Sequence, residues 1–220
     1  LDFFNLSQIA SSLSSLANLG IHPDIDWLTQ WFTRVFQDYK NFKFIELSNC
    51  LHAFTMLTIP LPKDFIDLIS DSFEHFEING KILRQIYTYN MVMKIYGFPQ
   101  SIIHTVKIDF DSIKEATDNK ISLLESDVKK YLDLFCYNEN GKWIPEIINY
   151  VDFYLPCRKL IIQVDGPCHF YQNGEYTVST KTQSLLIKSA GYRLFRLDYS
   201  IWQSFSEKEK HEYISNIICI

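Results

Sequence analysis

The stretch VDFYLPCRKLIIQVDGPCHFY, from Val151 to Tyr171, decides the fold of the second half of this chain. It predicts two β-strands joined by a tight turn, at Tyr150–Leu155 and Lys159–Asp165. The apolar run at Leu160 to Ile162 is typical of a strand that is buried on both faces. Gly166 and Pro167 then end the second strand, because both residues favour turns.

The residues around this stretch predict an α/β domain over 119–220. A helix is expected over Ser122–Phe135, where Ser122 and Glu125 have the spacing of a capping box. Asn140-Gly141 predicts a turn. The remaining predicted elements are strands at Trp143–Asn149 and Tyr192–Leu197 and helices at Val178–Ala190 and Ser206–Ile217. Since strands alternate with crossover helices, we expect a mixed sheet.

The first hundred residues predict helices. Apolar residues at three- and four-residue spacing favour helices over Asn5–Gly20 and Asp24–Tyr39. The segment Glu46–Pro62 resembles the first helix, with Leu47 following Leu6 by 41 positions (47 − 6). A fourth helix is expected over Asp64–Phe76, and a weaker third copy runs from Leu83 to Gly97.

Helix pairs that repeat at this period indicate an α-solenoid. We therefore expect an α+β chain, with a helical-repeat region over 1–99, a linker over 100–118 and the α/β domain over 119–220. An irregular helical bundle is the alternative for the first region. The chain begins without Met, so we expect it to be a piece of a longer protein whose further repeats and targeting segment are not visible.

Composition narrows the class of protein. Hydrophobic residues make up 47% of the 220, which is enough for a substantial core. No apolar run is long enough to predict a membrane span. The five Cys are scattered, without a CxxC pair, which indicates reduced thiols rather than a disulfide framework or a zinc site. We expect an intracellular protein, in the cytoplasm or in an organelle such as a mitochondrion or plastid.

The net charge of −5 bears on the partners of the chain. A protein whose affinity came mainly from neutralising phosphates would be basic. The charge therefore argues against tight, non-specific binding of nucleic acid, although it is compatible with a local basic groove.

Polar residues of the two central strands are expected to converge. Asp152 lies on the first strand, and Gln163 and Asp165 share one face of the second, because side chains alternate along a strand. Asp152 and Asp165, with Glu125 from the preceding helix, predict a site for Mg²⁺ or Mn²⁺. Gln163 would assist, and His169 and Lys181 would polarise or protonate a phosphate substrate. The pattern thus favours a metal-dependent nuclease, a phosphodiesterase.

Each of these residues also has a purely structural interpretation. Asp165 can cap the turn into Gly166, Glu125 can cap its helix, and His169 can pack by its ring. Asp152 lies between Val151 and Phe153 in an apolar strand, so its carboxylate needs a partner or a function.

The block from about Ile144 to Trp202 resembles the RAP domain, an RNA-binding type of module. The residues that carry the resemblance are VDFYLP, LIIQVDGPCHF, Thr180-Lys181, Gly191-Tyr192, Arg196-Leu197-Asp198-Tyr199 and Trp202. The resemblance implies a very-short-patch-repair or PD-(D/E)XK endonuclease-like fold, that is, a restriction-endonuclease-like domain. It also implies preceding helical repeats of the octotricopeptide or FAST-kinase type, and single-stranded RNA as the partner.

One residue departs from the family pattern. The family usually has Glu two residues before the Asp of the DGP run, and this chain has Gln163. A neutral amide supplies no charge to a hard cation. The hypotheses are therefore a metal-dependent endoribonuclease, a non-catalytic RNA-binding module, and a protein-interaction scaffold that binds its partner through the helical repeats and carries an inert nuclease-like domain.

Candidate RNA contacts lie in both halves of the chain. Tyr171 and Tyr176 are predicted in a loop, where their rings can stack on unpaired bases, and Lys181 can meet a phosphate. Polar residues on the repeat helices either face a ligand groove or are ordinary solvated positions; they are Gln8, Ser11, Asn49, His52, Gln85 and Thr88.

Overall fold

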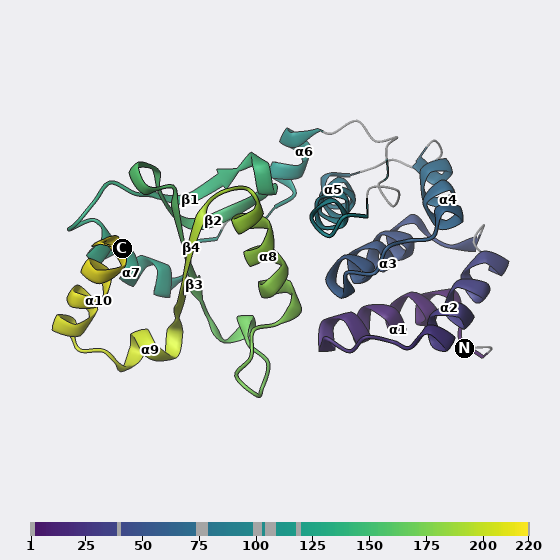
Figure 1. Cartoon of the computed structure of the whole chain (residues 1–220), viewed down its shortest axis with the longest axis horizontal. Coiled ribbons are helices and arrows are strands. Elements are labelled where there is room, and N and C mark those ends of the chain that lie inside the picture. Colours follow the sequence, from purple (N-terminus) through teal and green to yellow (C-terminus); the bar gives the residue numbers. More distant parts are fainter. Residues whose placement is uncertain are drawn as a thin grey trace. The chain divides into compact units, whose positions relative to one another are not determined.

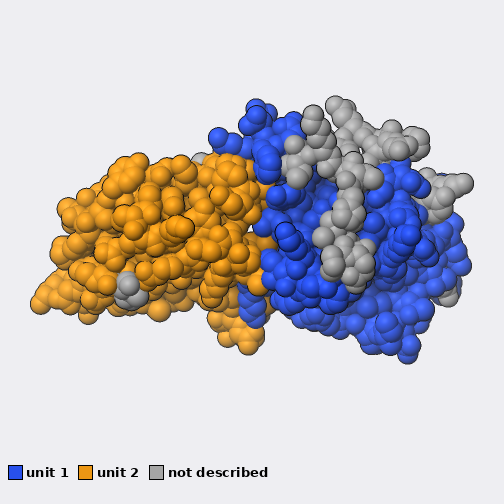
Figure 2. Space-filling model, turned by 45° about the horizontal axis from the view of Figure 1, so that its top comes forward, with its two compact units in different colours: residues 1–116, 177–182 blue, residues 117–176, 183–220 orange. Residues whose placement is uncertain are grey.

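The computed structural model describes residues 3–38, 41–73, 79–98, 103, 109–117 and 120–219. The chain is an α+β protein, as the sequence predicts, with helices in its first half and a mixed sheet in its second half (Figure 1). It divides into two compact units (Figure 2): Leu1–Ala116 with Thr177–Thr182, and Thr117–Tyr176 with Gln183–Ile220.

The first unit consists of helices. They are α1 (Leu6–Leu19), α2 (Ile25–Asp38), α3 (Phe44–Leu57), α4 (Lys63–Phe73), α5 (Gly80–Ile95) and the short α6 (Phe110–Glu115). Helix α1 packs against α3, and α3 packs against α5, so alternate helices of the chain are neighbours in space. The parts of the predicted second and fourth helices at Tyr39 and 74–76 lie outside the described residues, as do residues 100–102, 104–108 and 118 of the predicted linker.

The three stacked helices have matching ends. Their N-cap residues are Asn5, Lys43 and Asn79, which are 38 (43 − 5) and 36 (79 − 43) positions apart. After each helix, the N–H of Ile21, Ile59 or Phe98 donates to the carbonyl five positions earlier, at 2.8–3.0 Å. The structural offset between α1 and α3 is therefore 38 residues rather than the expected 41, because the caps and not the Leu-Ser pairs mark equivalent positions.

An aromatic cluster joins these helices. The indole of Trp31 on α2 is fully buried, and its Nε1 donates to the carbonyl of Ile9 on α1 at 3.0 Å. Its ring lies 5.4 Å from the ring of Phe54 on α3 and 6.0 Å from that of Phe65 on α4. Large buried rings supply much of the hydrophobic stabilisation of such a core.

The second unit is built around a four-stranded sheet in the order β1-β2-β3-β4. Its elements are α7 (Leu123–Leu132), β1 (Glu139–Ile144), β2 (Asn149–Leu155), β3 (Leu160–Asp165), β4 (Arg193–Asp198), α9 (Tyr199–Ser204), α10 (Glu207–Cys219) and, from Gln183 on, α8 (Val178–Ser189). The first three strands are antiparallel, and β4 is parallel to β3. Helix α8 is the crossover that a parallel pair requires.

The two faces of this sheet have different cover. Helices α7 and α10 lie on one face and α8 lies on the other (Figure 1). The first face carries a continuous apolar cluster that includes Phe153, Ile162, Leu197 and Trp202. Because side chains alternate along each strand, Asp152, Gln163, Asp165 and Arg196 fall on the α8 face.

Four local features differ from the sequence-based expectation. The strand predicted over Trp143–Asn149 lies earlier, at Glu139–Ile144, and a 3-10 turn follows it at Pro145–Ile147. Asn140-Gly141 forms no chain reversal but lies within β1, where Gly141 has a φ of 61°. Helix α9 directly follows β4 and was not predicted. Helix α6 forms within the predicted linker. The five Cys are unpaired with one another in this structure. Among the described residues, no helix has the length and apolar character needed to cross a membrane.

Two short connections of the same geometry link the antiparallel strands. Each is a single 3-10 turn that begins with Pro, at Pro145–Ile147 and Pro156–Arg158. Each ends in a residue with left-handed backbone, Ile148 with a φ of 46° and Lys159 with a φ of 47°. A side chain with a Cβ is strained in this region.

The exposed Lys159 therefore offers a test of the strain. Lys159→Gly is expected to raise the free energy of unfolding by about 0.5 kcal/mol, since it removes about 1–2 kcal/mol of steric cost and adds about 0.5–1 of backbone entropy. Urea unfolding measures the change. The neighbouring exposed Arg158→Gly is the control and should lower stability, because Arg158 is not among the residues with positive φ. Equal losses in both variants would contradict the argument.

Candidate functional site

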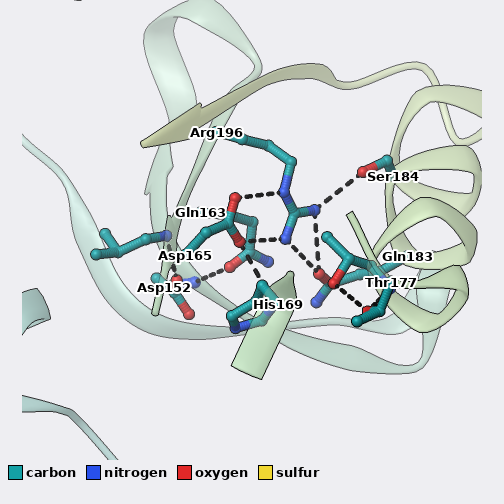
Figure 3. Close-up of polar contacts among 10 residues, drawn as sticks. Asp152, Gln163, Asp165, His169, Thr177, Gln183, Ser184 and Arg196 are labelled. Atoms are coloured by element: carbon teal, nitrogen blue, oxygen red, sulfur yellow. Dashed lines mark hydrogen bonds and ion pairs between the residues drawn. The ribbon is translucent and has the colours of Figure 1, made fainter. Parts of the chain in front are cut away.

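The centre of the α8 face is a buried ion pair between β3 and β4 (Figure 3). Asp165 ends β3 with its side chain 0% exposed, and Arg196 of β4 lies beside it with 9% exposed. The guanidinium Nε donates to Oδ2 of Asp165 at 2.7 Å, and Nη2 donates to Oδ1 at 2.5 Å. This is the two-pronged geometry in which arginine binds a carboxylate most strongly.

The rest of the guanidinium is held by α8. Nη1 donates to Oγ of Ser184 at 2.9 Å, and both Nη1 and Nη2 lie 3.3 Å from Oε1 of Gln183. A guanidinium has five N–H donors. All of its nitrogens are thus directed at Asp165 and at two side chains of α8, which leaves Arg196 no donor for an incoming anion.

Asp152 has partners of a different kind. The ladder between β2 and β3 ends at the pair of Phe153 and Ile162. Beyond that pair, the side chain of Asp152 takes over, and its Oδ2 accepts from the N–H of Val164 at 2.6 Å. The carboxylate of Asp152 thus accepts the N–H of Val164, which a backbone carbonyl of β2 would accept in a regular ladder.

The amide of Gln163 connects the two carboxylates. Gln163 is 3% exposed. With its oxygen and nitrogen assigned from the hydrogen-bonding pattern, its nitrogen donates to Oδ2 and Oδ1 of Asp152 at 2.8 and 3.0 Å. Its oxygen accepts from Nε2 of Gln183 at 3.2 Å. Since Gln183 also accepts from Arg196, a continuous hydrogen-bonded chain runs from Asp152 to Asp165.

Burial controls the charge of Asp152. It raises the pKa of Asp152 from its ordinary 3.8 to about 7, and the charges of Glu125 and Asp165 act in the same direction. The N–H of Val164 and the charge of Arg196 oppose the shift of the pKa. Donation from Gln163 also favours the ionised form. Near neutral pH, a substantial fraction of Asp152 is therefore protonated and carries no charge.

His169 and Glu125 are placed differently from each other. His169 lies one turn after Asp165, 35% exposed, with its Nδ1 3.5 Å from Oδ1 of Asp165. Burial and Arg196 lower the pKa of His169, and Asp165 opposes them. Glu125 is the helix cap of α7: its Oε1 accepts from the N–H of Ser122 at 3.0 Å, in the predicted capping box. The charge of Glu125 raises the pKa of Asp152, but the carboxylate itself is hydrogen-bonded in the capping box.

The candidate RNA contacts differ in their exposure and in their neighbours. The ring of Tyr176 stacks on that of Phe170 at 4.8 Å, and the guanidinium of Arg196 lies 5.4 Å from its centre. Tyr176 is thus already engaged within the loop. Tyr171 is half-buried at the base of the exposed turn that reaches Glu175. Lys181 is exposed on the first turn of α8, in the segment that groups with the first unit.

The donor set does not fit the predicted Mg²⁺ or Mn²⁺ ion. Within the described residues, no group of three or more His, Cys, Asp and Glu side chains is placed to hold a metal. Both oxygens of Asp165 face a fixed positive charge, and Glu125 serves as a cap. A hard divalent cation prefers several anionic oxygens. The guanidinium of Arg196 occupies the position beside Asp165 in which a metal ion would have to bind.

Three residues of the site were not predicted from the sequence: Arg196, Gln183 and Ser184. A signal for Arg196 was present, because a charge within the strand RLFRLD needs a buried partner for the same reason as Asp152 does. Gln183 and Ser184 gave no such signal. They are polar residues on an amphipathic helix, and only the packing of α8 on the sheet brings them to Arg196.

Two comparisons with known proteins bear on the family of this chain. No curated protein matches the chain. The family model of the RAP domain matches residues 162–217, a range that includes Gln163, Asp165, His169, Gln183 and Arg196 and leaves out Asp152. Over that range, the resemblance to the RAP domain is confirmed.

Proposed function

We propose that this chain binds RNA and that its nuclease-like site is a structural centre without a catalytic metal. The RAP domain match supports the RNA-related role, because the RAP domain is an RNA-binding type of module. The observation that carries the non-catalytic part of the proposal is the pairing of both Asp165 oxygens with Arg196.

Charge balance supports this choice over the metal-dependent nuclease. A buried carboxylate and a buried guanidinium neutralise each other, and separating them leaves an uncompensated charge. A divalent ion would have to displace Arg196 from Asp165 and would gain only the weakly charged Asp152 in addition. The site therefore favours its present partners over a metal.

The RNA contacts are then expected outside this centre. The residues that we propose for them are Tyr171 of the second unit and Lys181 on the first turn of α8. Tyr176 has the supporting role of fixing the loop, because its ring already contacts Phe170 and Arg196.

Incubation of the full chain with labelled single-stranded RNA tests the proposal. We expect binding at low salt that is the same with Mg²⁺, with Mn²⁺ or with a chelator, and no cleavage of the RNA. The measurements are fluorescence anisotropy and gel electrophoresis of the RNA. Asp165→Asn is the matched variant, since it removes the charge and keeps the shape.

Other outcomes select the other hypotheses. Metal-dependent cleavage that is lost in both Asp152→Asn and Asp165→Asn would identify an endoribonuclease and overturn the non-catalytic assignment. Absence of binding at low salt, where electrostatic attraction is strongest, would leave the protein-interaction scaffold.

A further inference from the structure

Two cysteines of the second unit, Cys136 and Cys157, lie at matching positions just beyond the paired part of two strands. The antiparallel ladder of β1 and β2 ends at the pair of Glu139 and Tyr154. Cys136 precedes this pair by three positions (139 − 136), and Cys157 follows it by three (157 − 154). The register of the two strands, continued past the end of the ladder, therefore sets one thiol opposite the other.

This register suits a covalent bond between the two sulfurs. Opposite residues of an antiparallel pair have Cα atoms about 4.5–5.5 Å apart. A disulfide joins residues whose Cα atoms are about 4.4–6.8 Å apart. Cysteines that follow the register of β1 and β2 are thus within the reach of a disulfide.

The electrostatics of the two thiols agrees with this placement. Burial raises the pKa of Cys136 above its ordinary value, the charge of Cys157 raises it further, and the charge of Arg158 opposes the shift. One charge shifts the pKa of another group mainly over about 4–6 Å. The influence of Cys157 on Cys136 is therefore the influence of a near neighbour.

The backbone holds both cysteines in place. At the end of α7, the N–H of Cys136 donates to the carbonyl of Leu132 at 3.1 Å. Cys157 is the middle residue of the 3-10 turn Pro156–Arg158, which the N–H of Lys159 closes at 3.2 Å. Neither cysteine lies in a long loop, so little backbone freedom is lost when the sulfurs meet.

The two thiols differ in exposure, which gives them different roles. Cys157 is exposed to solvent, where it can meet a small oxidant. Cys136 is half-buried and packs against the apolar cluster of the second unit. An exposed thiol beside a second, more protected one is the usual arrangement of a reversible redox pair.

We propose that Cys136 and Cys157 form a reversible disulfide when the protein meets hydrogen peroxide. The thiolate of Cys157 attacks one oxygen of the peroxide, so that an S–O bond forms, the O–O bond breaks and one water leaves. The sulfur of Cys136 loses its proton and attacks the sulfur of the resulting sulfenic acid. The S–S bond forms, the S–O bond breaks and a second water leaves. The two thiols lose two electrons and two protons, and the peroxide is reduced to water.

The disulfide changes the stability of the second unit. It joins the end of α7 to the connection between β2 and β3, and it closes a loop that contains β1 and β2. Closing a loop restricts the unfolded chain, so the oxidised protein is expected to melt at a temperature about 5–10 °C higher than the reduced protein. This inference goes beyond the proposed RNA binding and does not depend on it.

Mild oxidation of the full chain tests the pair. The reduced protein is treated with hydrogen peroxide, its remaining thiols are alkylated, and it is digested without reductant for mass spectrometry. We expect a cross-linked peptide that contains Cys136 and Cys157 and that dithiothreitol separates. The melting temperature is measured before oxidation, after oxidation and after reduction, and only the oxidised protein should show the rise.

Three single variants identify the thiols. Cys136→Ser and Cys157→Ser should each lose the cross-link and the rise in melting temperature on oxidation. Cys136→Ser should in addition stop at the sulfenic acid of Cys157, which dimedone traps. Cys168→Ser is the control, because it removes another exposed thiol of the same unit, and it should keep both the cross-link and the rise. Each variant is compared with its own reduced form, so a change in folding caused by the substitution itself does not affect the result.

The contrary outcomes are equally specific. A disulfide from Cys157 to Cys168, or between two copies of the chain, would overturn the proposed pair. A rise in melting temperature on oxidation that persists in Cys157→Ser would also overturn it. None of these outcomes bears on whether the unchanged chain binds RNA, so the proposed function stands or fails by its own test.

Discussion

Arg196→Met is expected to lower the free energy of unfolding by about 3–5 kcal/mol, because it leaves the carboxylate of Asp165 buried and without its cation. Met has a similar length and no N–H donors. The loss should therefore come from Asp165, which is 0% exposed, rather than from packing. Urea unfolding of the variant beside the unchanged chain measures it.

Two companion variants identify the cause of this loss. The double variant Arg196→Met/Asp165→Leu should recover most of the lost stability, since replacing both partners of a buried pair by apolar residues is often neutral or stabilising. Arg196→Lys keeps the positive charge but loses the two-pronged hydrogen bonding. Its free energy of unfolding should therefore lie between those of Arg196→Met and the double variant. A double variant as unstable as Arg196→Met would contradict the assignment to an unpaired carboxylate.

The Arg196→Met variant also tests whether the site can bind a divalent metal ion. With the guanidinium removed, Asp165, Asp152 and the oxygen of Gln163 become candidate ligands, so Mn²⁺ should raise the melting temperature of Arg196→Met and leave that of the unchanged chain as it is. An equal rise in both proteins would mean that the ion binds without displacing Arg196.

The second large effect concerns pH. Because the pKa of Asp152 is raised from 3.8 to about 7, the folded state binds a proton that the unfolded state has already lost. The contribution of Asp152 to the free energy of unfolding is fully present below pH 4 and is lost as the pH rises to about 7. Above that pH, it no longer changes. The total is on the order of 4 kcal/mol for a shift of about 3 units.

Asp152→Asn should remove this part of the pH dependence. The variant is expected to resemble the unchanged chain near pH 4 and to be the more stable of the two at pH 8, as measured by urea unfolding across that range. Asp133→Asn is the control, because a hydrogen bond from Lys129 lowers the pKa of that exposed carboxyl and the slope has the opposite sign. A difference between Asp152→Asn and the unchanged chain that does not grow with pH would contradict the assignment.

The sequence predicted the parts of the fold that depend on local patterns. Alternation and apolar runs place β2 and β3 within a residue of their bounds, and the capping box at Ser122 and Glu125 is present. Cap residues also mark equivalent ends of α1 and α3, yet the expected offset followed the Leu-Ser pair. Apolar residues recur every three or four positions, so several offsets match equally well, whereas caps occur once per helix.

The site was less predictable for a related reason. Period-two alternation correctly put Gln163 and Asp165 on one face, but it says nothing of which strand lies next to them. The parallel register that sets Arg196 beside Gln163 depends on the crossover of α8. Asn140-Gly141 also shows the limit of a dipeptide signal, because the tertiary pairing of β1 with β2 extends through it.

The hydrogen bonds between Arg196 and Asp152 all point one way. The guanidinium donates to Gln183, Gln183 donates to Gln163, and Gln163 donates to Asp152. A primary amide can reverse its direction only by turning over. When Asp152 takes up a proton on one oxygen, its other oxygen still accepts from the amide of Gln163, so the direction of the chain is kept. The orientation of both amides is therefore set by Arg196, because a guanidinium can only donate and the oxygen of Gln183 must face it.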